Sequence, residues 1–360
     1  MHKQRFGSYY ERLGIPAILV LPVQILIFME VNNIVIHSIS KARGESPELI
    51  LSEQILSIDE RVRFLAEKLA SAFRNDKKVV RCNFRNSQLD FQQSLRNYIN
   101  QNFRQFDFYS HSFDSIDRLR DLLISVSFAT GGYYVFVDYE MNYIRWVGVF
   151  VVRDSDEVSF SMNEDTHEFV VQLTKIVNTN KLAMACRINV NRLVNGQDRY
   201  LNLTHKQGSE SEYFIEWVEA ELAEKNKEDT NTLLRIIADI DRPIDPDTGE
   251  EYEENKFRKQ VHDYISGNGQ LINIFDLGER FWDNSQKVSD FAEGLDLIIN
   301  TEFRSSGAIK KLDRYSYTSG KIKLDFSHKD YRNGTVRVLS DNTVLINSEE
   351  LSEKIRREHS

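Results

Sequence analysis

Cysteine is scarce in this sequence: Cys82 and Cys186 are its two cysteines in 360 residues, and they lie far apart. That count excludes a disulfide-stapled scaffold and a clustered cysteine metal site, and it indicates a reducing compartment. Five prolines and sixteen glycines are too few for long flexible linkers. The length instead predicts two domains, or one large domain with an appendage, and a hydrophobic content of 41% supplies their cores.

Sequence motifs that identify a particular enzymatic reaction are also absent. No Walker loop, nucleophile elbow or dinucleotide-binding glycine pattern occurs, and no two histidines have the spacing of metal ligands. The polar turn at 242–251 resembles a calcium loop, but Pro246 and the position of its glycine break the pattern. Asp247, Glu254 and Lys256 imitate a metal-dependent nuclease signature, although such carboxylates normally come from adjacent strands. We therefore predict no catalytic residue, no metal and no cofactor.

A hydrophobic run long enough to cross a bilayer is absent as well. Residues 15–29 are apolar over about fifteen positions, short of the roughly twenty that a spanning helix needs, and they contain Pro16 and Pro22. This run is a weak membrane anchor, an apolar arm packed on the protein or a partner, or the result of translation that truly starts at Met29. We favour the last interpretation, because a globular pattern begins directly after Met29. We expect 1–28 to be an N-terminal extension, no stable membrane insertion and a cytoplasmic location.

Positive charge is in deficit, with 46 basic against 55 acidic residues, which argues against simple coating of nucleic acid. The deficit is local, however. The segment 210–256 holds 16 acidic and 5 basic residues, so the rest of the chain is slightly positive. Local potential decides phosphate binding, because screening limits each charge to about 8–10 Å. Two stretches of the chain are rich in basic residues, and each is either a DNA-binding surface or simply a solvated surface. Their candidate DNA-binding residues are Lys77, Lys78, Arg81, Arg85, Lys310, Lys311, Arg314, Lys321 and Lys323.

Hydrophobic periodicity predicts an α+β fold. Residues 33–40 alternate and are rich in β-branched side chains, and the aromatic runs 133–139 and 143–152 are typical of a β-hairpin. Both runs are apolar on both faces, which places them at the centre of a sheet covered on both sides. Amphipathic helices are predicted from Asp59 and over 115–128. We expect a mixed, largely antiparallel sheet domain with flanking helices.

The pattern becomes helical and acidic after this domain, and returns to short strands and a closing helix near the C-terminus. We predict four parts in order: the apolar N-terminal extension 1–28, an α+β sheet domain 29–206, an acidic helical segment 207–300 and a small α+β C-terminal region 301–360.

Three stretches together suggest a family. Val31–Lys41 (VNNIVIHSISK) contains a strand with a histidine, His37, and Ala129–Val152 contains a glycine-rich turn followed by two apolar strands. Ile188–Val218 continues with a strand, a polar insert, an Arg-Tyr-Leu strand and a helix. In these stretches the chain resembles the bacterial nucleoid-associated proteins of the NdpA type. The resemblance implies association with DNA in the nucleoid and no enzymatic activity, and its motifs are structural.

Three functions compete on this basis. The first is a non-enzymatic nucleoid-associated protein that binds backbone phosphates with little sequence readout. The second is an adaptor whose acidic helices bind a DNA-processing protein. The third is a metal-dependent nuclease in phage defence, which we rank last. A homodimer would double the phosphate contacts, but the sequence does not show one.

Overall fold

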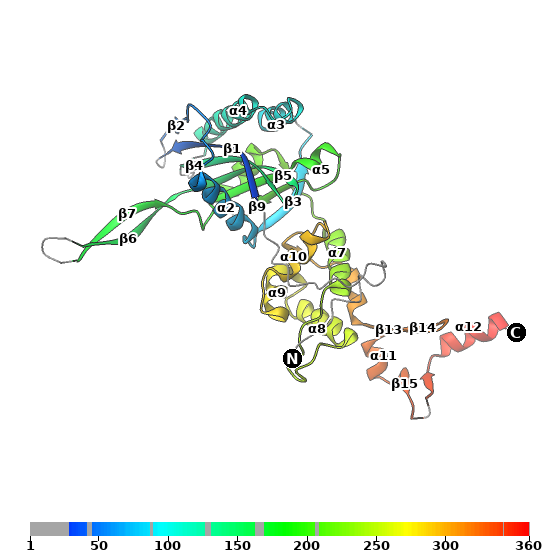
Figure 1. The fold of residues 1–360 in the computed structure, drawn as a ribbon. Coiled ribbons are helices and arrows are strands. Elements are labelled where there is room, and N and C mark those ends of the chain that lie inside the picture. The colour runs from blue at the N-terminus through cyan, green and yellow to red at the C-terminus, as the bar shows by residue number, and fades with distance from the viewer. Residues whose placement is uncertain are drawn as a thin grey trace, which may run out of the picture.

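The computed structural model describes residues 29–41, 45–86, 89–126, 131–162, 169–205, 209–340 and 342–359. The predicted extension 1–28 lies outside the described residues. The α+β prediction is confirmed: a large antiparallel sheet carries helices on both faces, a helical region follows it, and small β-hairpins lie near the C-terminus (Figure 1). Among the described helices, none is both long and apolar enough to cross a bilayer.

Eight strands form the main sheet, in the order β10-β3-β9-β8-β5-β4-β1-β2. Every pairing in it is antiparallel. In chain order the strands are β1 (Met29–Ser40), β2 (Glu48–Ile50), β3 (Val79–Phe84), β4 (Gly132–Met141), β5 (Ile144–Val152), β8 (Met184–Asn189), β9 (Leu201–Thr204) and β10 (Ala220–Glu221).

The predicted hairpin is confirmed as β4 and β5, which lie inside the sheet with neighbours on both sides. Successive β4 residues enter opposite cores, because side chains alternate across a strand. Val135 packs with α2 (Glu60–Arg74) on one face, and Phe136 packs under α3 (Asp90–Asn100), α4 (Gln105–Ile124) and α6 (Ser209–Trp217) on the other. Burial on both faces therefore explains why residues 133–137 of β4 and 146–152 of β5 include no charged side chain.

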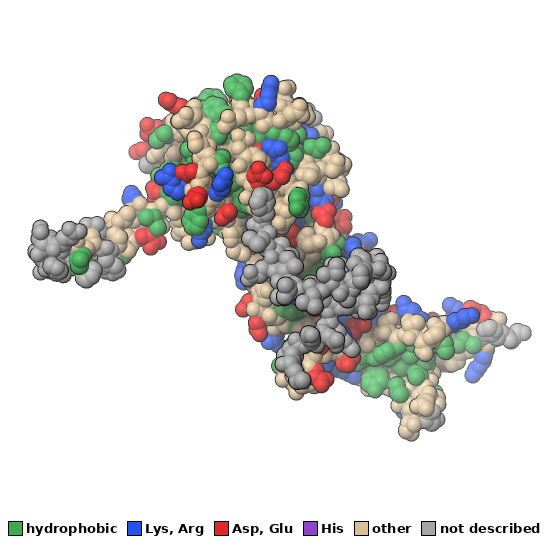
Figure 2. Space-filling model, in the orientation of Figure 1, with side chains coloured by type: hydrophobic (Ala, Val, Ile, Leu, Met, Phe, Trp, Pro, Cys, Tyr) green, Lys and Arg blue, Asp and Glu red, His purple; other side chains and the backbone are tan. Residues whose placement is uncertain are grey.

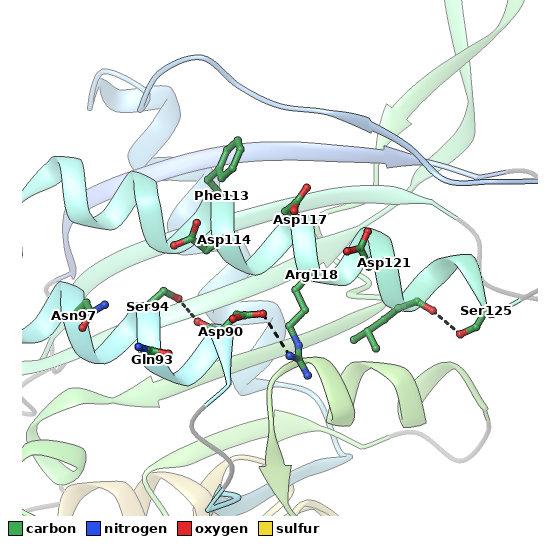
Figure 3. A pocket seen from close by; sticks show the side chains of 11 residues that line it. Asp90, Gln93, Ser94, Asn97, Phe113, Asp114, Asp117, Arg118, Asp121 and Ser125 are labelled. Atoms are coloured by element: carbon green, nitrogen blue, oxygen red, sulfur yellow. Dashed lines mark hydrogen bonds and ion pairs between the residues drawn. The ribbon is translucent and has the colours of Figure 1, made fainter.

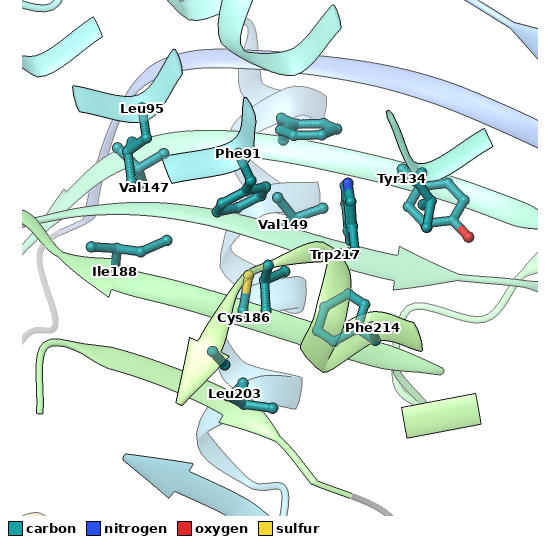
Figure 4. Packing of buried hydrophobic residues seen from close by; sticks show 14 of the residues in the cluster. Phe91, Leu95, Tyr134, Val147, Val149, Cys186, Ile188, Leu203, Phe214 and Trp217 are labelled. Atoms are coloured by element: carbon teal, nitrogen blue, oxygen red, sulfur yellow. The ribbon is translucent and has the colours of Figure 1, made fainter. Parts of the chain in front are cut away.

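Trp217 stands at the centre of the core under the α3–α4 layer (Figure 4). Its ring meets Phe91, Tyr134, Phe136 and Phe214 edge-on, with centroids 5.5–6.3 Å apart. Its buried indole N–H donates to the Ser115 carbonyl at 2.6 Å, which satisfies the polar atom of this apolar side chain. The last turn of α6 is thereby fastened to the sheet domain.

The helical region has a separate core. It contains α7 (Asn226–Asp239), α8 (Glu254–Gly267), α9 (Ile274–Trp282), α10 (Lys287–Gly294), the 3₁₀ helix η2 (Gly307–Asp313) and the hairpin β11 (Leu271–Asn273) with β12 (Glu302–Arg304). Along the chain, the boundary between the two cores lies between Ala220 and Leu233. The sequence places the start of the acidic segment at residue 207, but α6 within it covers the sheet, because its apolar stripe faces inward.

Two further parts project from these cores (Figure 1). The hairpin of β6 (Asp154–Met162) and β7 (Phe169–Val177) extends from the sheet domain and is not predicted from the sequence. Residues 314–359, which we call the C-terminal arm, extend from the helical region. The arm contains β13 (Arg314–Ser319), β14 (Ile322–Ser327), α11 (His328–Arg332), β15 (Val336–Val338), β16 (Val344–Ile346) and α12 (Glu349–His359), close to the predicted strands and closing helix.

Candidate nucleic-acid interface

The first basic stretch lies against the helical region. Lys77 and Lys78 follow the end of α2, and their Nζ atoms lie 2.9 Å from Asp276 Oδ1 and 3.1 Å from Glu302 Oε1. Arg74 in the last turn of α2 is 2.6 Å from Asp290. These cations join two parts of the chain that are about 200 residues apart in sequence. Lys77 and Lys78 would have to leave carboxylate partners in order to bind phosphate.

Arg81 and Arg85 are also engaged within the protein. The Arg81 guanidinium donates to the Ile299 carbonyl, and its backbone N–H donates to Asn300 Oδ1 at 2.8 Å. Burial lowers the pKa of Arg81 to about 10, and nearby Arg187 adds to this effect. Arg85 Nε donates to the Ala220 carbonyl at 3.0 Å, although the residue is exposed. Arg81 in particular stabilises the contact between the two cores.

The second basic stretch faces solvent. Lys310 and Lys311 are exposed on η2, and Arg314, Lys321 and Lys323 are exposed on the β13–β14 hairpin. Arg314 Nε lies 2.5 Å from Asp325 Oδ1, while the four lysines have no ion pair within the part of the chain that is described. We call Lys310, Lys311, Lys321 and Lys323 the lysine group. Their charges are available to a ligand, because no carboxylate neutralises them.

The neighbouring sequence contains exposed cations that the residue-by-residue prediction missed, namely Lys329, Arg332 and Arg337. The signal that could have identified them is charge asymmetry. From Arg304 to residue 340 the chain has nine basic residues and three acidic ones, whereas the preceding segment 210–256 is strongly acidic. The positive potential therefore covers η2, the β13–β14 hairpin and α11 rather than a few positions.

The register of the β13–β14 hairpin separates its polar and apolar side chains. Thr318 pairs with Lys323, and Ser316 pairs with Asp325, which puts these side chains and Arg314 on one face. The opposite face carries the apolar pairs Tyr315–Phe326 and Tyr317–Leu324. The Tyr315 and Tyr317 rings stack with centroids 6.0 Å apart, so the aromatic side chains and the basic side chains Arg314 and Lys323 lie on opposite faces.

The groove between α3 and α4 has the opposite charge (Figure 3). It is a cavity of about 700 Å³ whose lining includes Asp90, Asp114, Asp117 and Asp121, with Arg118 3.5 Å from Asp90. Burial raises the pKa of Asp114, and the charges of Asp90 and Asp117 raise it further. This groove repels phosphate. The described residues contain no group of side chains suited to hold a metal ion.

Two of the nuclease-like residues, Lys256 and Asp247, form an ion pair, and Lys256 also pairs with Asp245. Lys256 Nζ lies 2.6 Å from Asp245 Oδ2 and 3.3 Å from Asp247 Oδ2. The hydrogen bond from Lys256 lowers the pKa of Asp245. Lys256 thus neutralises Asp247, one of the two carboxylates that a catalytic metal would need, and these residues lie in a turn and in the first turn of α8 rather than on paired strands of a sheet.

His37, the histidine of the family resemblance, is buried between the sheet and α4. The Ser52 N–H donates to Nδ1 at 3.2 Å, so Nε2 carries the proton and donates to Ser112 Oγ at 3.0 Å. Burial lowers the pKa of His37 to about 4. His37 is therefore a neutral structural residue at pH 7. Cys82 and Cys186 are free and buried, and burial raises both thiol pKa values, that of Cys186 to about 12.

Comparison with known proteins places this fold among bacterial relatives. The model of the family described as nucleoid-associated protein YejK matches residues 35–350. A nucleoid-associated protein of Actinobacillus pleuropneumoniae serotype 3 is 25% identical over 315 residues, which cover 83% of this chain and 89% of the relative. A nucleoid-associated protein from Aliivibrio salmonicida is 22% identical, and the match covers 82% of this chain and 87% of the relative. A nucleoid-associated protein from Vibrio vulnificus is 23% identical, and the match covers 83% of this chain and 89% of the relative.

Proposed function

Because this chain belongs to the family of nucleoid-associated protein YejK, we propose that it binds DNA in the bacterial nucleoid, within the cytoplasm, without catalysing a reaction. The binding is electrostatic and directed at backbone phosphates, with little readout of base sequence. One observation carries this proposal: the lysine group is exposed and unpaired on η2 and the β13–β14 hairpin, beside Arg314. The net charge of −9 does not oppose it, because phosphate is attracted by the potential within about 10 Å.

Other surfaces fit DNA less well. The α3–α4 groove is lined by aspartates. The projecting β6–β7 hairpin carries exposed acidic residues, Asp156 and Glu157, on the same strand. Lys77 and Lys78 hold the helical region through ion pairs. We therefore place the DNA on the lysine group, with Lys77, Lys78, Arg81 and Arg85 contributing to the position of that region rather than to the main phosphate contacts.

Replacing the four members of the lysine group by glutamine is expected to weaken binding of a labelled duplex, measured by fluorescence anisotropy across a salt series. Each lost phosphate contact reduces the slope of log K against log salt concentration by about 0.9, so the slope should fall by about 3–4 if all four contact DNA. At the lower salt concentrations the affinity should fall at least about tenfold. Single-stranded and double-stranded DNA should both remain uncleaved by the protein, with and without Mg²⁺.

A matched control removes the same charge elsewhere. Lys68, Lys175, Lys181 and Lys227 are exposed lysines outside the C-terminal third of the chain. Glutamine at these four positions should leave the salt slope within about one unit of the wild-type value. Equal losses in both variants would reject the assigned surface. A wild-type chain that binds no DNA at low salt would reject DNA binding and favour the adaptor, and DNA cleavage would favour a nuclease.

A further inference from the structure

The C-terminal arm exposes an unusual amount of apolar surface. Ten large hydrophobic side chains between residues 317 and 355 are exposed to between 38% and 74%: Tyr317, Ile322, Tyr331, Val338, Leu339, Val344, Leu345, Ile346, Leu351 and Ile355. In Figure 2, hydrophobic side chains are prominent on this part of the molecule. Only Phe326, His328 and Val336 are buried among the described residues of the arm. The arm does not bury its own apolar residues.

Helix α12 is the clearest case. It has eleven residues, and those of its side chains whose exposure is described all face solvent. Isolated helices shorter than about 12–15 residues are marginal in water, and most helical stability comes from packing an apolar face. Leu351 and Ile355 are four residues apart, so they lie on one side of the helix and form such a face. A second surface is needed to cover it.

The charge pattern of α12 suits a second copy of the same helix. The first half is acidic, with Glu349, Glu350 and Glu353, and the second half is mainly basic, with Lys354, Arg356 and Arg357 beside one acidic residue, Glu358. Two copies packed antiparallel, with Leu351 against Ile355 of the partner subunit, would bring Glu349 and Glu350 beside the basic second half of the other helix. The same segment is therefore complementary to itself about a twofold axis, as an isologous interface requires.

The exposed area is sufficient for a stable dimer. At roughly 150–200 Å² for a complete large apolar side chain, the ten exposures add up to on the order of 800–1,000 Å² per chain. A specific interface of standard size buries about 800 Å² per partner, so the summed apolar exposure of the arm is comparable to the area of such an interface.

We propose that the C-terminal arms of two copies of this chain associate through an antiparallel pair of α12 helices, with Leu351 and Ile355 at the centre and charged pairs at the ends. This inference goes beyond DNA binding and does not depend on it. It has a consequence for the lysine group, however. The β13–β14 hairpin places Lys323 on the face opposite Tyr317 and Ile322, so its apolar face joins the interface while its basic face stays open to a ligand.

Charge-swap variants of the full chain test the proposal by sedimentation equilibrium. The wild type is expected to be a dimer. E349K/E350K puts lysine against the basic half of the second helix, and R356E/R357E puts glutamate against the acidic half, so each variant alone should dimerise at least about tenfold more weakly. An equimolar mixture of the two should form a heterodimer with affinity close to that of the wild type, because every end pair is then opposite in charge.

A helix that binds a different partner would not show this rescue. A monomeric wild type, or a mixture that stays monomeric while both variants retain the wild-type circular dichroism spectrum, overturns the proposal. Leu351→Ala with Ile355→Ala supplies an independent measurement, since it removes the apolar centre and keeps all charges. It should also weaken the dimer at least about tenfold, and an unchanged dimer would contradict the assigned interface. DNA binding, followed by anisotropy on the same samples, reports separately on the lysine group.

Discussion

Asp229→Ala is expected to lower the free energy of unfolding by about 3–5 kcal/mol. Asp229 on α7 and Arg199, just before β9, form an ion pair between the two cores, and their side chains are 0% and 5% exposed. Both terminal guanidinium nitrogens of Arg199 lie 2.7 Å from Asp229 Oδ1, which also accepts from the Asn300 N–H at 3.2 Å. Alanine would leave a buried guanidinium without its charged partner and a backbone N–H without its acceptor. Urea denaturation followed by tryptophan fluorescence measures the loss.

A neighbouring ion pair is the control for this prediction. Lys77 and Asp276 also join the sheet domain to the helical region, but their side chains are 55% and 49% exposed. Asp276→Ala should therefore cost less than about 1 kcal/mol, because solvent screens an exposed pair and replaces its hydrogen bonds. Replacing Asp229 and Arg199 together by leucine and methionine should recover much of the loss. If Asp229→Ala were no more destabilising than Asp276→Ala, burial of the first pair would not matter to stability.

Lowering the pH from 7 to 5 is expected to reduce the free energy of unfolding by about 4 kcal/mol through two buried histidines. Burial lowers the pKa of His37 to about 4 and that of His111 to about 3. Above pH 6.5 the folded and unfolded chains both hold neutral histidines. Below pH 6.5 the unfolded chain binds protons that the folded chain excludes, so each histidine favours unfolding by about 2 kcal/mol at pH 5. Urea titrations at pH 7, 6 and 5 measure this loss.

His37→Gln isolates one of these groups, while His111 and His328, whose pKa values burial also lowers, remain in the variant. The glutamine amide can donate to Ser112 in place of Nε2 and does not titrate, so the pH dependence between 6.5 and 5 should fall by about half. Asp59, Asp245 and Asp330 have lowered pKa values and ionise below this interval, so they do not account for the loss. An unchanged pH dependence in the glutamine variant would show that His37 is not the group that titrates.

Much of the fold could be predicted from local pattern. The aromatic runs that became β4 and β5 are largely apolar on both faces, and a sheet covered on both sides accommodates them. The N-terminal half of α4 was not predicted, because it buries His111, Ser112 and Ser115 where a helical apolar stripe is expected. Hydrogen bonds between these side chains and their neighbours replace apolar packing there, and hydrophobic periodicity does not detect them.

The candidate site could be predicted only in part. Composition drew attention to two basic stretches equally, but the structure separates them. Arg81 contacts Ile299 and Asn300, whereas Lys321 and Lys323 face solvent without a carboxylate partner in the described chain. The number of basic residues is a property of the sequence, while their neutralisation depends on acidic residues far along the chain. The sequence alone therefore could not distinguish the basic residues that form ion pairs from those that do not.

By itself, the sequence determined the fold class, the central hairpin and the resemblance to nucleoid-associated proteins, because alternation, burial and turn chemistry act within a few residues. Only the tertiary structure decided which cations are free, that Arg199 meets Asp229 across the two cores, and that the C-terminal arm leaves its apolar face uncovered. Those properties arise from contacts between residues separated by tens to hundreds of positions, and such contacts exist only after the chain has folded.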